Sequence, residues 1–155
     1  MKNLKYLFIF FFLLSCGYTP IYQTDQNSKI KLDIINYSGN KELGRSIIKG
    51  VERLKNNAST NIYDLNFTSS KKEAIAAKDK KGNISTYKLI IEIDVSLKNK
   101  ENNKVFSKKF SEETTYNSMN NKFELNQYKL NLEKNMISQI LQDLNIFLSI
   151  IGNDL

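Results

Sequence analysis

The sequence contains no histidine, one cysteine, one proline and six glycines among its 155 residues. Without histidine there can be no His-based catalytic triad, no histidine general base and no histidine ligand for a metal. One cysteine cannot form an intramolecular disulfide or a cysteine-rich zinc site. The few prolines and glycines offer few domain boundaries, and the length is typical of a single domain. A hydrophobic content of 41% excludes a disordered or fibrous chain.

The patterns that mark common enzymes are also absent from the sequence. Gly39 and Gly44 lack the rest of a nucleotide-binding glycine motif. Glu112 and Glu113 are adjacent, so on a strand they point to opposite faces and cannot act together on one substrate. The carboxylates are not clustered at the spacing of a metal-binding loop. We therefore predict that the protein is not an enzyme and holds no metal and no cofactor.

Positive charge is in excess, with 23 Lys and Arg residues against 16 Asp and Glu residues and a net charge of +7. Only two of the basic residues are arginine. We expect most of the lysines to form a solvated surface with a weak preference for anionic partners. Lys71, Lys72, Lys108 and Lys109 are expected on exposed strand surfaces, where lysine discourages edge-to-edge pairing.

Residues 1–15 have the pattern of a signal peptide. Lys2 and Lys5 precede a nine-residue apolar run, which is shorter than the roughly 20 residues that cross a bilayer and fits the core of a secretory signal. The sequence Leu-Leu-Ser-Cys follows and resembles a bacterial lipobox, with Cys16 as the lipidated residue. Several acyl chains on Cys16 would form a stable membrane anchor. An ordinary signal peptide followed by a chance cysteine is the alternative.

The residue after the cysteine indicates the location of the mature protein, and cleavage of the signal peptide changes its net charge. By resemblance to Gram-negative lipoproteins, Gly17 in place of aspartate favours the outer membrane, with the protein facing the periplasm. Cleavage removes Lys2 and Lys5 and leaves a net charge of +5 on the mature chain. Residues 16–28 are predicted to be the lipidated N-terminus and a tether. Export makes nucleic acid an unsuitable partner.

Residues 29–155 are predicted to form a single α+β domain that begins with a strand and a helix. Apolar and polar residues alternate over 29–35, which predicts a short strand. Residues 37–41 contain Gly39 and Asn40 and have the composition of a turn. Apolar residues then recur every three to four positions, which predicts a helix over residues 41–56 with Asn40 as its N-cap.

Three strands are predicted next. One begins at Tyr63, and its continuation over residues 74–78 fits a strand or a helix equally well. A turn is expected at residues 80–83. The clearest alternation in the chain follows over residues 87–97, with apolar residues on one face. After another polar turn, residues 105–116 predict the last strand.

A long terminal helix is predicted from Lys122 to Ile151. Asn121 and Glu124 resemble a capping box at its start, and Gly152 is expected just beyond its end. The predicted fold is therefore two helices packed on one face of a four-stranded mixed, mostly antiparallel sheet, in the order β-α-β-β-β-α. The apolar stripe of the helix consists mainly of Leu125, Tyr128, Leu132, Met136, Ile140, Leu144, Phe147 and Ile151.

Three stretches resemble the lipopolysaccharide-assembly lipoprotein family LptE, in its alphaproteobacterial form. They are residues 13–22, residues 73–87, and residues 115–117 with the long helix that follows. The order of elements is similar along nearly the whole mature chain. The resemblance implies a lipid-anchored, non-catalytic protein at the periplasmic face of the outer membrane. Its partner would be an LptD-like β-barrel, which it plugs and helps to assemble, and so it would aid lipopolysaccharide transport to the cell surface.

The resemblance also implies direct contact with lipopolysaccharide. Lys80 and Lys81 match the turn that carries a basic residue in the family. A second basic residue of the family lies near the start of the last helix, where this sequence has Leu125, with Lys122 nearby. The candidate lipopolysaccharide contacts are therefore Lys80, Lys81 and Lys122.

Two other functions remain open at this point. The chain could be a general outer-membrane lipoprotein that binds another envelope partner. It could also be a periplasmic ligand-binding module, which should show a sizeable apolar pocket. A filled core with a large polar face would favour the barrel plug, because the lumen of such a barrel is polar.

Overall fold

The computed structural model describes residues 30–53 and 59–153. Along the chain, its elements are β1 (Ile30–Gly39), α2 (Lys41–Glu52), β2 (Asn61–Lys78), β3 (Ile84–Asn99), β4 (Val105–Asn117) and α3 (Lys122–Asn153). The predicted α+β fold and its element order are confirmed. The signal peptide, Cys16, the tether and the predicted end of the first helix at residues 54–56 lie outside the described residues.

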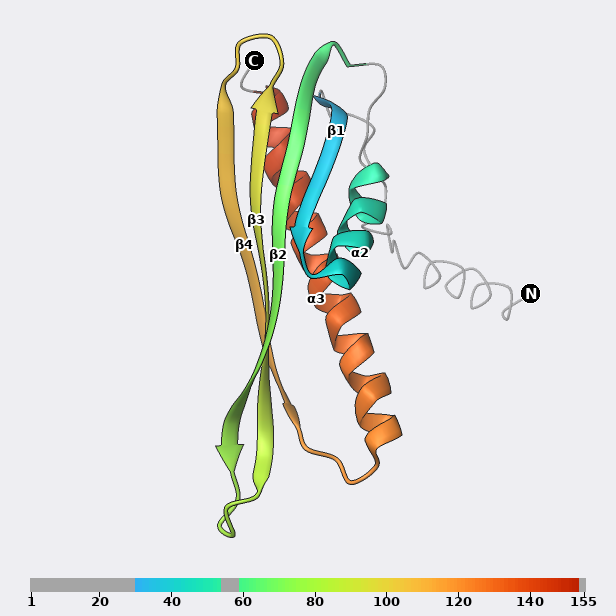
Figure 1. Cartoon of the computed structure of the whole chain (residues 1–155), viewed down its shortest axis with the longest axis vertical. Coiled ribbons are helices and arrows are strands. Elements are labelled where there is room, and N and C mark those ends of the chain that lie inside the picture. Colours follow the sequence, from blue (N-terminus) through green and yellow to red (C-terminus); the bar gives the residue numbers. More distant parts are fainter. Residues whose placement is uncertain (1–29, 54–58, 154–155) are drawn as a thin grey trace, which may run out of the picture.

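The four strands form one sheet in the order β1-β2-β3-β4. The pair β1 and β2 is parallel, whereas β2, β3 and β4 form an antiparallel meander. Both helices pack on one face of this sheet, and the long β2–β3 hairpin and α3 extend well beyond α2 along the long axis of the molecule (Figure 1). The register between β1 and β2 ends at Gly39 opposite Ser69. The sheet is therefore four strands wide at one end and three strands wide at the other.

The core lies between the helices and the sheet, as the alternation of β3 predicts. Leu89, Ile91, Ile93, Val95 and Leu97 are all buried on the same face of β3. The other elements supply the remaining apolar side chains of this core. They include Leu43, Ile47 and Val51 from α2, Tyr63, Leu65 and Phe67 from β2, and Met136, Ile140, Leu144, Leu148 and Ile151 from α3.

Both helix starts are capped as predicted. The side-chain oxygen of Asn40 accepts hydrogen bonds from the backbone N–H groups of Glu42 and Leu43, each at 3.1 Å. The side-chain oxygen of Asn121 likewise accepts from the N–H groups of Phe123 and Glu124. These bonds satisfy N–H groups that have no partner inside the helix.

Several predicted boundaries are wrong. The first strand does not end at residue 35, because pairing with β2 carries it through the expected turn to Gly39. Gly152 does not end the last helix, since α3 continues to Asn153 and Gly152 is buried within it. Tyr128 does not belong to the buried stripe, because its side chain is 41% exposed. The uncertain stretch over residues 74–78 is a strand that pairs with β3.

Candidate partner-binding surface

The face of the sheet that points away from the helices is mainly polar on all four strands, with Ile90 and Val105 as apolar exceptions. Neighbouring strands are joined there by pairs of small polar side chains. The amide of Asn36 donates to Asn66 at 3.1 Å, and the hydroxyls of Ser38 and Thr68 lie 2.9 Å apart. We call this surface the polar sheet face. Its exposed or half-exposed polar members include Asn36, Ser38, Asn66, Thr68, Lys72, Lys88, Glu92, Asp94, Ser96, Ser107, Lys109, Ser111 and Glu113.

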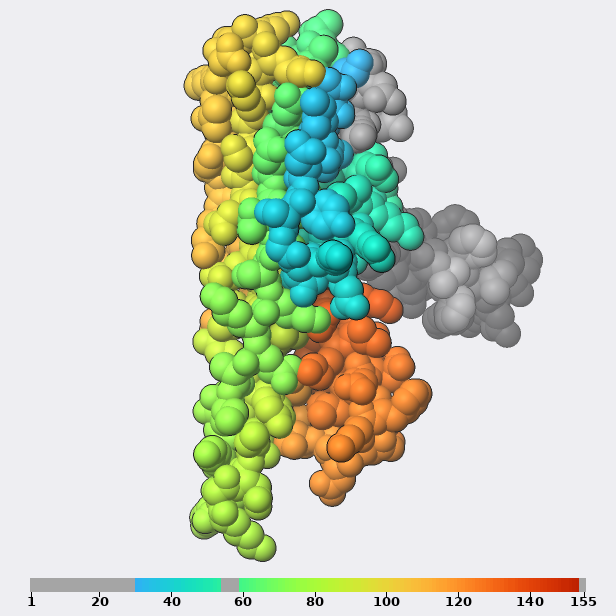
Figure 2. All heavy atoms as spheres, viewed as in Figure 1, coloured from blue at the N-terminus to red at the C-terminus, as the bar shows by residue number. Residues whose placement is uncertain are grey.

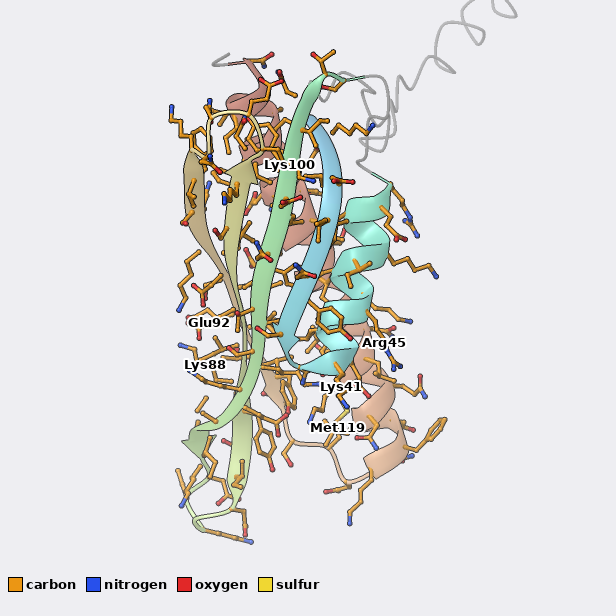
Figure 3. The ribbon with its side chains drawn as sticks, turned by 45° about the horizontal axis from the view of Figure 1, so that its top comes forward. Lys41, Arg45, Lys88, Glu92, Lys100 and Met119 are labelled. Atoms are coloured by element: carbon orange, nitrogen blue, oxygen red, sulfur yellow. The ribbon has the colours of Figure 1, made fainter. Side chains whose placement is uncertain are left out.

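The charges on the polar sheet face are largely paired. Glu92 binds the ammonium groups of Lys109 at 2.8 Å and Lys72 at 3.4 Å, so one carboxylate on β3 bridges β2 and β4. The hydrogen bond from Lys109 and then that from Lys72 lower the pKa of Glu92, and the bond to Glu92 raises the pKa of Lys109. Lys88 and Glu113 form a further pair at 2.7 Å. Figure 3 shows Lys88 and Glu92 on the side of the ribbon away from α2.

A shallow depression of about 610 Å³ crosses this face. Hydroxyl and amide residues from β1, β2, β3 and β4 line it, together with Tyr37, Phe67 and Val95, one carboxylate and two lysines. Both polar and apolar groups therefore contribute to this lining. Because the depression is open and shallow, it suits a broad contact surface better than the enclosure of a small molecule.

Near the strand ends, a separate charge cluster joins β1, β2 and the β3–β4 turn. The ammonium group of Lys100 binds the carboxylate of Asp33 and lies 3.7 Å from that of Asp64. The hydrogen bond to Asp33 raises the pKa of Lys100. Asp64 also accepts a hydrogen bond from the backbone N–H of Ile34 at 3.3 Å. This cluster fixes β1 against β2 beside the interruption in their register between Leu32 and Ile35.

The β2–β3 hairpin places Lys80 and Lys81 at one tip of the molecule. The carboxylate of Asp79 accepts hydrogen bonds from the backbone N–H groups of Lys81 and Asn83, at 2.8 and 2.9 Å. Hydrogen bonds from Asn83 and from the backbone of the loop lower the pKa of Asp79. Asp79 thus organises the loop, and both lysines are exposed at its tip. Figure 2 shows the hairpin projecting beyond the rest of the described residues.

Lys122, the third candidate lipopolysaccharide contact, is exposed in the first turn of α3. The start of α3 lies towards the same end of the molecule as the hairpin (Figure 1). The segment before α3 is linked to the hairpin near its turn, where the N–H of Ser118 donates to the carbonyl of Ser85 at 2.9 Å. The fold therefore brings the three candidate residues to one end. Their contact with lipopolysaccharide stays a prediction.

Between α3 and the narrow end of the sheet lies a polar cluster that the sequence did not reveal. The ammonium group of Lys71 binds the carboxylate of Glu133 at 2.9 Å, so Lys71 does not belong to the exposed surface that was predicted for it. Lys129 binds Glu73 and lies over the ring of Tyr116, with the ammonium 5.7 Å from the ring centroid. The partners come from β2, β4 and α3, far apart along the chain, and no local pattern relates them.

Contacts in this cluster change the pKa values of Glu73 and Tyr116. Burial would raise the pKa of Glu73, but hydrogen bonds from Lys129 and Tyr116 outweigh it and the net pKa is lowered. Burial, followed by the hydrogen bond to Glu73, raises the pKa of Tyr116. Glu73 therefore stays ionised and Tyr116 stays protonated at neutral pH. The cluster holds α3 on the sheet.

The described residues show neither a metal site nor a membrane-spanning helix. Residues 30–53 and 59–153 contain no group of three or more Cys, Asp or Glu side chains that could hold a metal ion. Within the same ranges, neither α2 nor α3 has both the length and the apolar character needed to cross a membrane.

Solved structures of bacterial lipoproteins share this fold. The rare lipoprotein B of Shewanella oneidensis is 16% identical with a TM-score of 0.57, and the match covers 78% of this chain and 98% of that one. Lipoprotein B of Nitrosomonas europaea is 12% identical with a TM-score of 0.53, covering 81% and 86%. A minor lipoprotein of Acinetobacter baumannii is 13% identical with a TM-score of 0.52, covering 74% and 92%.

At these identities the likeness concerns the fold alone. No protein-family model matches the sequence, and no curated protein matches it. The chain therefore has the fold of these lipoproteins, and nearly the whole length of the Shewanella protein is matched.

Proposed function

We propose that this chain is a lipoprotein of the outer membrane that occupies the lumen of an LptD-like β-barrel, helps the barrel to assemble and aids lipopolysaccharide transport. The lipobox at Cys16 supplies the anchor, and the protein faces the periplasm. The fold shared with lipoproteins agrees with the sequence resemblance to LptE. The protein acts by contact with its partner and not as an enzyme.

The polar sheet face is the observation that carries this proposal. A barrel lumen is polar, so a domain that fills it needs a wide polar surface rather than an apolar patch. Here most of the sheet face presents hydroxyls, amides and paired charges, with Ile90 and Val105 as apolar exceptions, while the apolar side of the same sheet packs against α2 and α3. Such a surface can stay solvated before the complex forms and make water-mediated contacts afterwards.

Affinity capture of the partner protein from detergent-solubilised cell envelope tests the proposal. Full-length tagged protein with Cys16 intact should recover a large β-barrel protein in stoichiometric amount, and mass spectrometry identifies it. The Cys16→Ser variant separates the anchor from the domain, because it should lose membrane attachment and still bind the solubilised barrel. Recovery of the lipoprotein alone, under conditions that preserve other barrel complexes, would overturn the plug and favour the general lipoprotein role.

The role of the hairpin is tested separately. We propose that Lys80 and Lys81, with Lys122 nearby, contact the phosphates and carboxylates of lipopolysaccharide. Lys80→Glu with Lys81→Glu should weaken binding of purified lipopolysaccharide and leave barrel capture unchanged. The control is the same charge change at Lys98, at the opposite end of β3, and Lys104, in the turn that follows β3. Equal binding of lipopolysaccharide by the two double variants would show that the hairpin is not part of the lipopolysaccharide site.

A further inference from the structure

Four basic residues form a row on the exposed side of α2, which we call the α2 basic stripe. Lys41, Arg45, Lys49 and Arg53 recur every four residues and all are exposed. Arg53 directly follows the helix and keeps helical backbone angles, with φ −74° and ψ −19°. Four residues advance about 6 Å along a helix and slightly exceed one turn, so the four side chains follow one exposed side of the helix in a gradually rotating row. Figure 3 shows Lys41 and Arg45 on the first turns of α2.

The α2 basic stripe differs from the paired charges of the polar sheet face and of the cluster under α3; like Lys80 and Lys81 at the hairpin tip, it forms no ion pair with another described residue. Lysines on the polar sheet face and in the cluster under α3 bind carboxylates. Among residues 30–53 and 59–153, no ion pair within 4.0 Å joins any stripe residue to an acid, although Glu42 and Glu52 lie on the same helix. Both arginines of the chain belong to the stripe. Arginine suits carboxylate recognition because its planar group donates two parallel hydrogen bonds.

A membrane surface is a poor match for this helix. Leu43, Ile47 and Val51 form the apolar side of α2, and all three are buried in the core. Ile48 is partly buried against the core, and the exposed large hydrophobic residues among those described lie on other elements, so α2 has no exposed apolar face to insert between lipids. A lipid surface could attract the stripe by charge alone.

A strand that carries acidic residues matches the stripe in both charge and spacing. Alternate residues of a strand face the same side and lie about 6.6–6.8 Å apart, close to the interval of about 6 Å between stripe residues. We infer that the α2 basic stripe docks against a row of Asp and Glu side chains on the inner wall of the partner barrel. This inference rests on the proposed function and identifies α2 as a second contact, on the opposite side of the domain from the polar sheet face.

Charge reversal with a matched control tests the inference. Arg45→Glu with Lys49→Glu removes two stripe cations, and Lys104→Glu with Lys134→Glu makes the same change in net charge at exposed positions off the stripe. The stripe variant should recover about tenfold less barrel than the control, because like charges placed opposite each other strongly disfavour association. Arg45→Gln with Lys49→Gln should give an intermediate loss. Circular dichroism should show the same fold for every variant.

Zero-length carbodiimide cross-linking gives a direct second readout. The reagent joins a lysine amine to a carboxylate that touches it, so Lys41 or Lys49 should be linked to Asp or Glu residues of the barrel. Equal barrel capture by the stripe and control variants, or the absence of these cross-links, would overturn the inference and leave the plug intact. Loss of binding to phosphatidylglycerol vesicles without loss of barrel capture would overturn it in favour of lipid. If the wild type captures no barrel, the inference and the proposed function both fail.

Discussion

Replacing Gly39 by alanine should destabilise the protein far more than the same change at Gly82. Both glycines have positive φ, 91° and 84°, so alanine at either site pays a similar cost of about 1–2 kcal/mol for a left-handed conformation. The gain from restricting the unfolded chain, about 0.4–1 kcal/mol, is also common to both. The two variants therefore differ mainly in what the new methyl group meets.

The surroundings of the two glycines are opposite. A Cβ at Gly39 would lie 2.0 Å from the backbone oxygen of Ser69, whereas one at Gly82 would meet nothing within 4 Å. Relief of the clash requires the end of β1 to move away from β2. That movement breaks the hydrogen bond from the N–H of Asn40 to the carbonyl of Ser69, now 3.0 Å long, and disturbs the N-cap of α2. A backbone hydrogen bond and an N-cap contribute about 1 kcal/mol each.

Gly39→Ala should therefore cost at least about 2 kcal/mol more than Gly82→Ala, summing the lost hydrogen bond and the lost cap. Urea unfolding of the full-length protein in mild detergent, followed by circular dichroism, measures both variants. Equal destabilisation by the two would show that the conformational cost dominates. It would also refute the inference that the contact between Gly39 and Ser69 fixes the turn from β1 into α2.

Three further changes test the core, the polar cluster and a cap by the same unfolding assay. Leu144→Ala should cost about 2–5 kcal/mol because Leu144 is 1% exposed, whereas Ile146→Ala, at a side chain 55% exposed, should cost far less. The pKa of Glu73 is lowered in the fold, so its ionic contribution is present above the unfolded pKa and is lost as pH falls through the folded value. Glu73→Gln should flatten this acid dependence, whereas Glu101→Gln in the exposed β3–β4 turn should not. Asn40→Ala should cost about 0.5–2 kcal/mol by removing the cap, with a smaller loss for Asn40→Gly.

The parts of the fold that the sequence predicted correctly depend on local periodicity. The alternation over residues 87–97 identifies β3 and its buried face without reference to any other segment. The apolar stripe of α3 and the two asparagine caps are equally local signals. The order of these elements then restricts the topology, because a strand-helix-strand unit permits a parallel pair and short turns join antiparallel strands.

The wrong boundaries arise where contacts across strands outweigh local composition. Residues 37–41 have turn composition, yet Tyr37 stacks on Phe67 with ring centroids 5.9 Å apart, and β1 stays extended to Gly39. Similarly, the alanines at residues 74–77 suit a helix, but their pairing with β3 makes them a strand. Neither outcome can be read from the segment alone, because the partner strand lies about 30 residues away in one case and about 10 to 15 in the other.

In the candidate surfaces, too, local sequence patterns predict some features, whereas others depend on contacts between distant segments. Alternation predicts that one face of the sheet is polar, but it does not predict that Glu92 neutralises lysines from two neighbouring strands. The spacing of the α2 basic stripe is visible in the sequence, whereas its lack of acidic partners among the described residues becomes clear only after the ion pairs elsewhere are located.

The charges of the polar sheet face are largely paired, and those of the α2 basic stripe are not. We therefore expect binding through these two surfaces to depend differently on salt concentration. Paired charges present a small net field, so binding through the polar sheet face should change little as salt concentration rises. The α2 basic stripe presents four cations of one sign, and salt screens such an exposed field over a distance of about 10 Å at moderate ionic strength. Barrel capture by the wild type should weaken with added salt, and capture by Arg45→Gln with Lys49→Gln should be less sensitive. Parallel salt curves for the two proteins would place the electrostatic contact elsewhere on the domain.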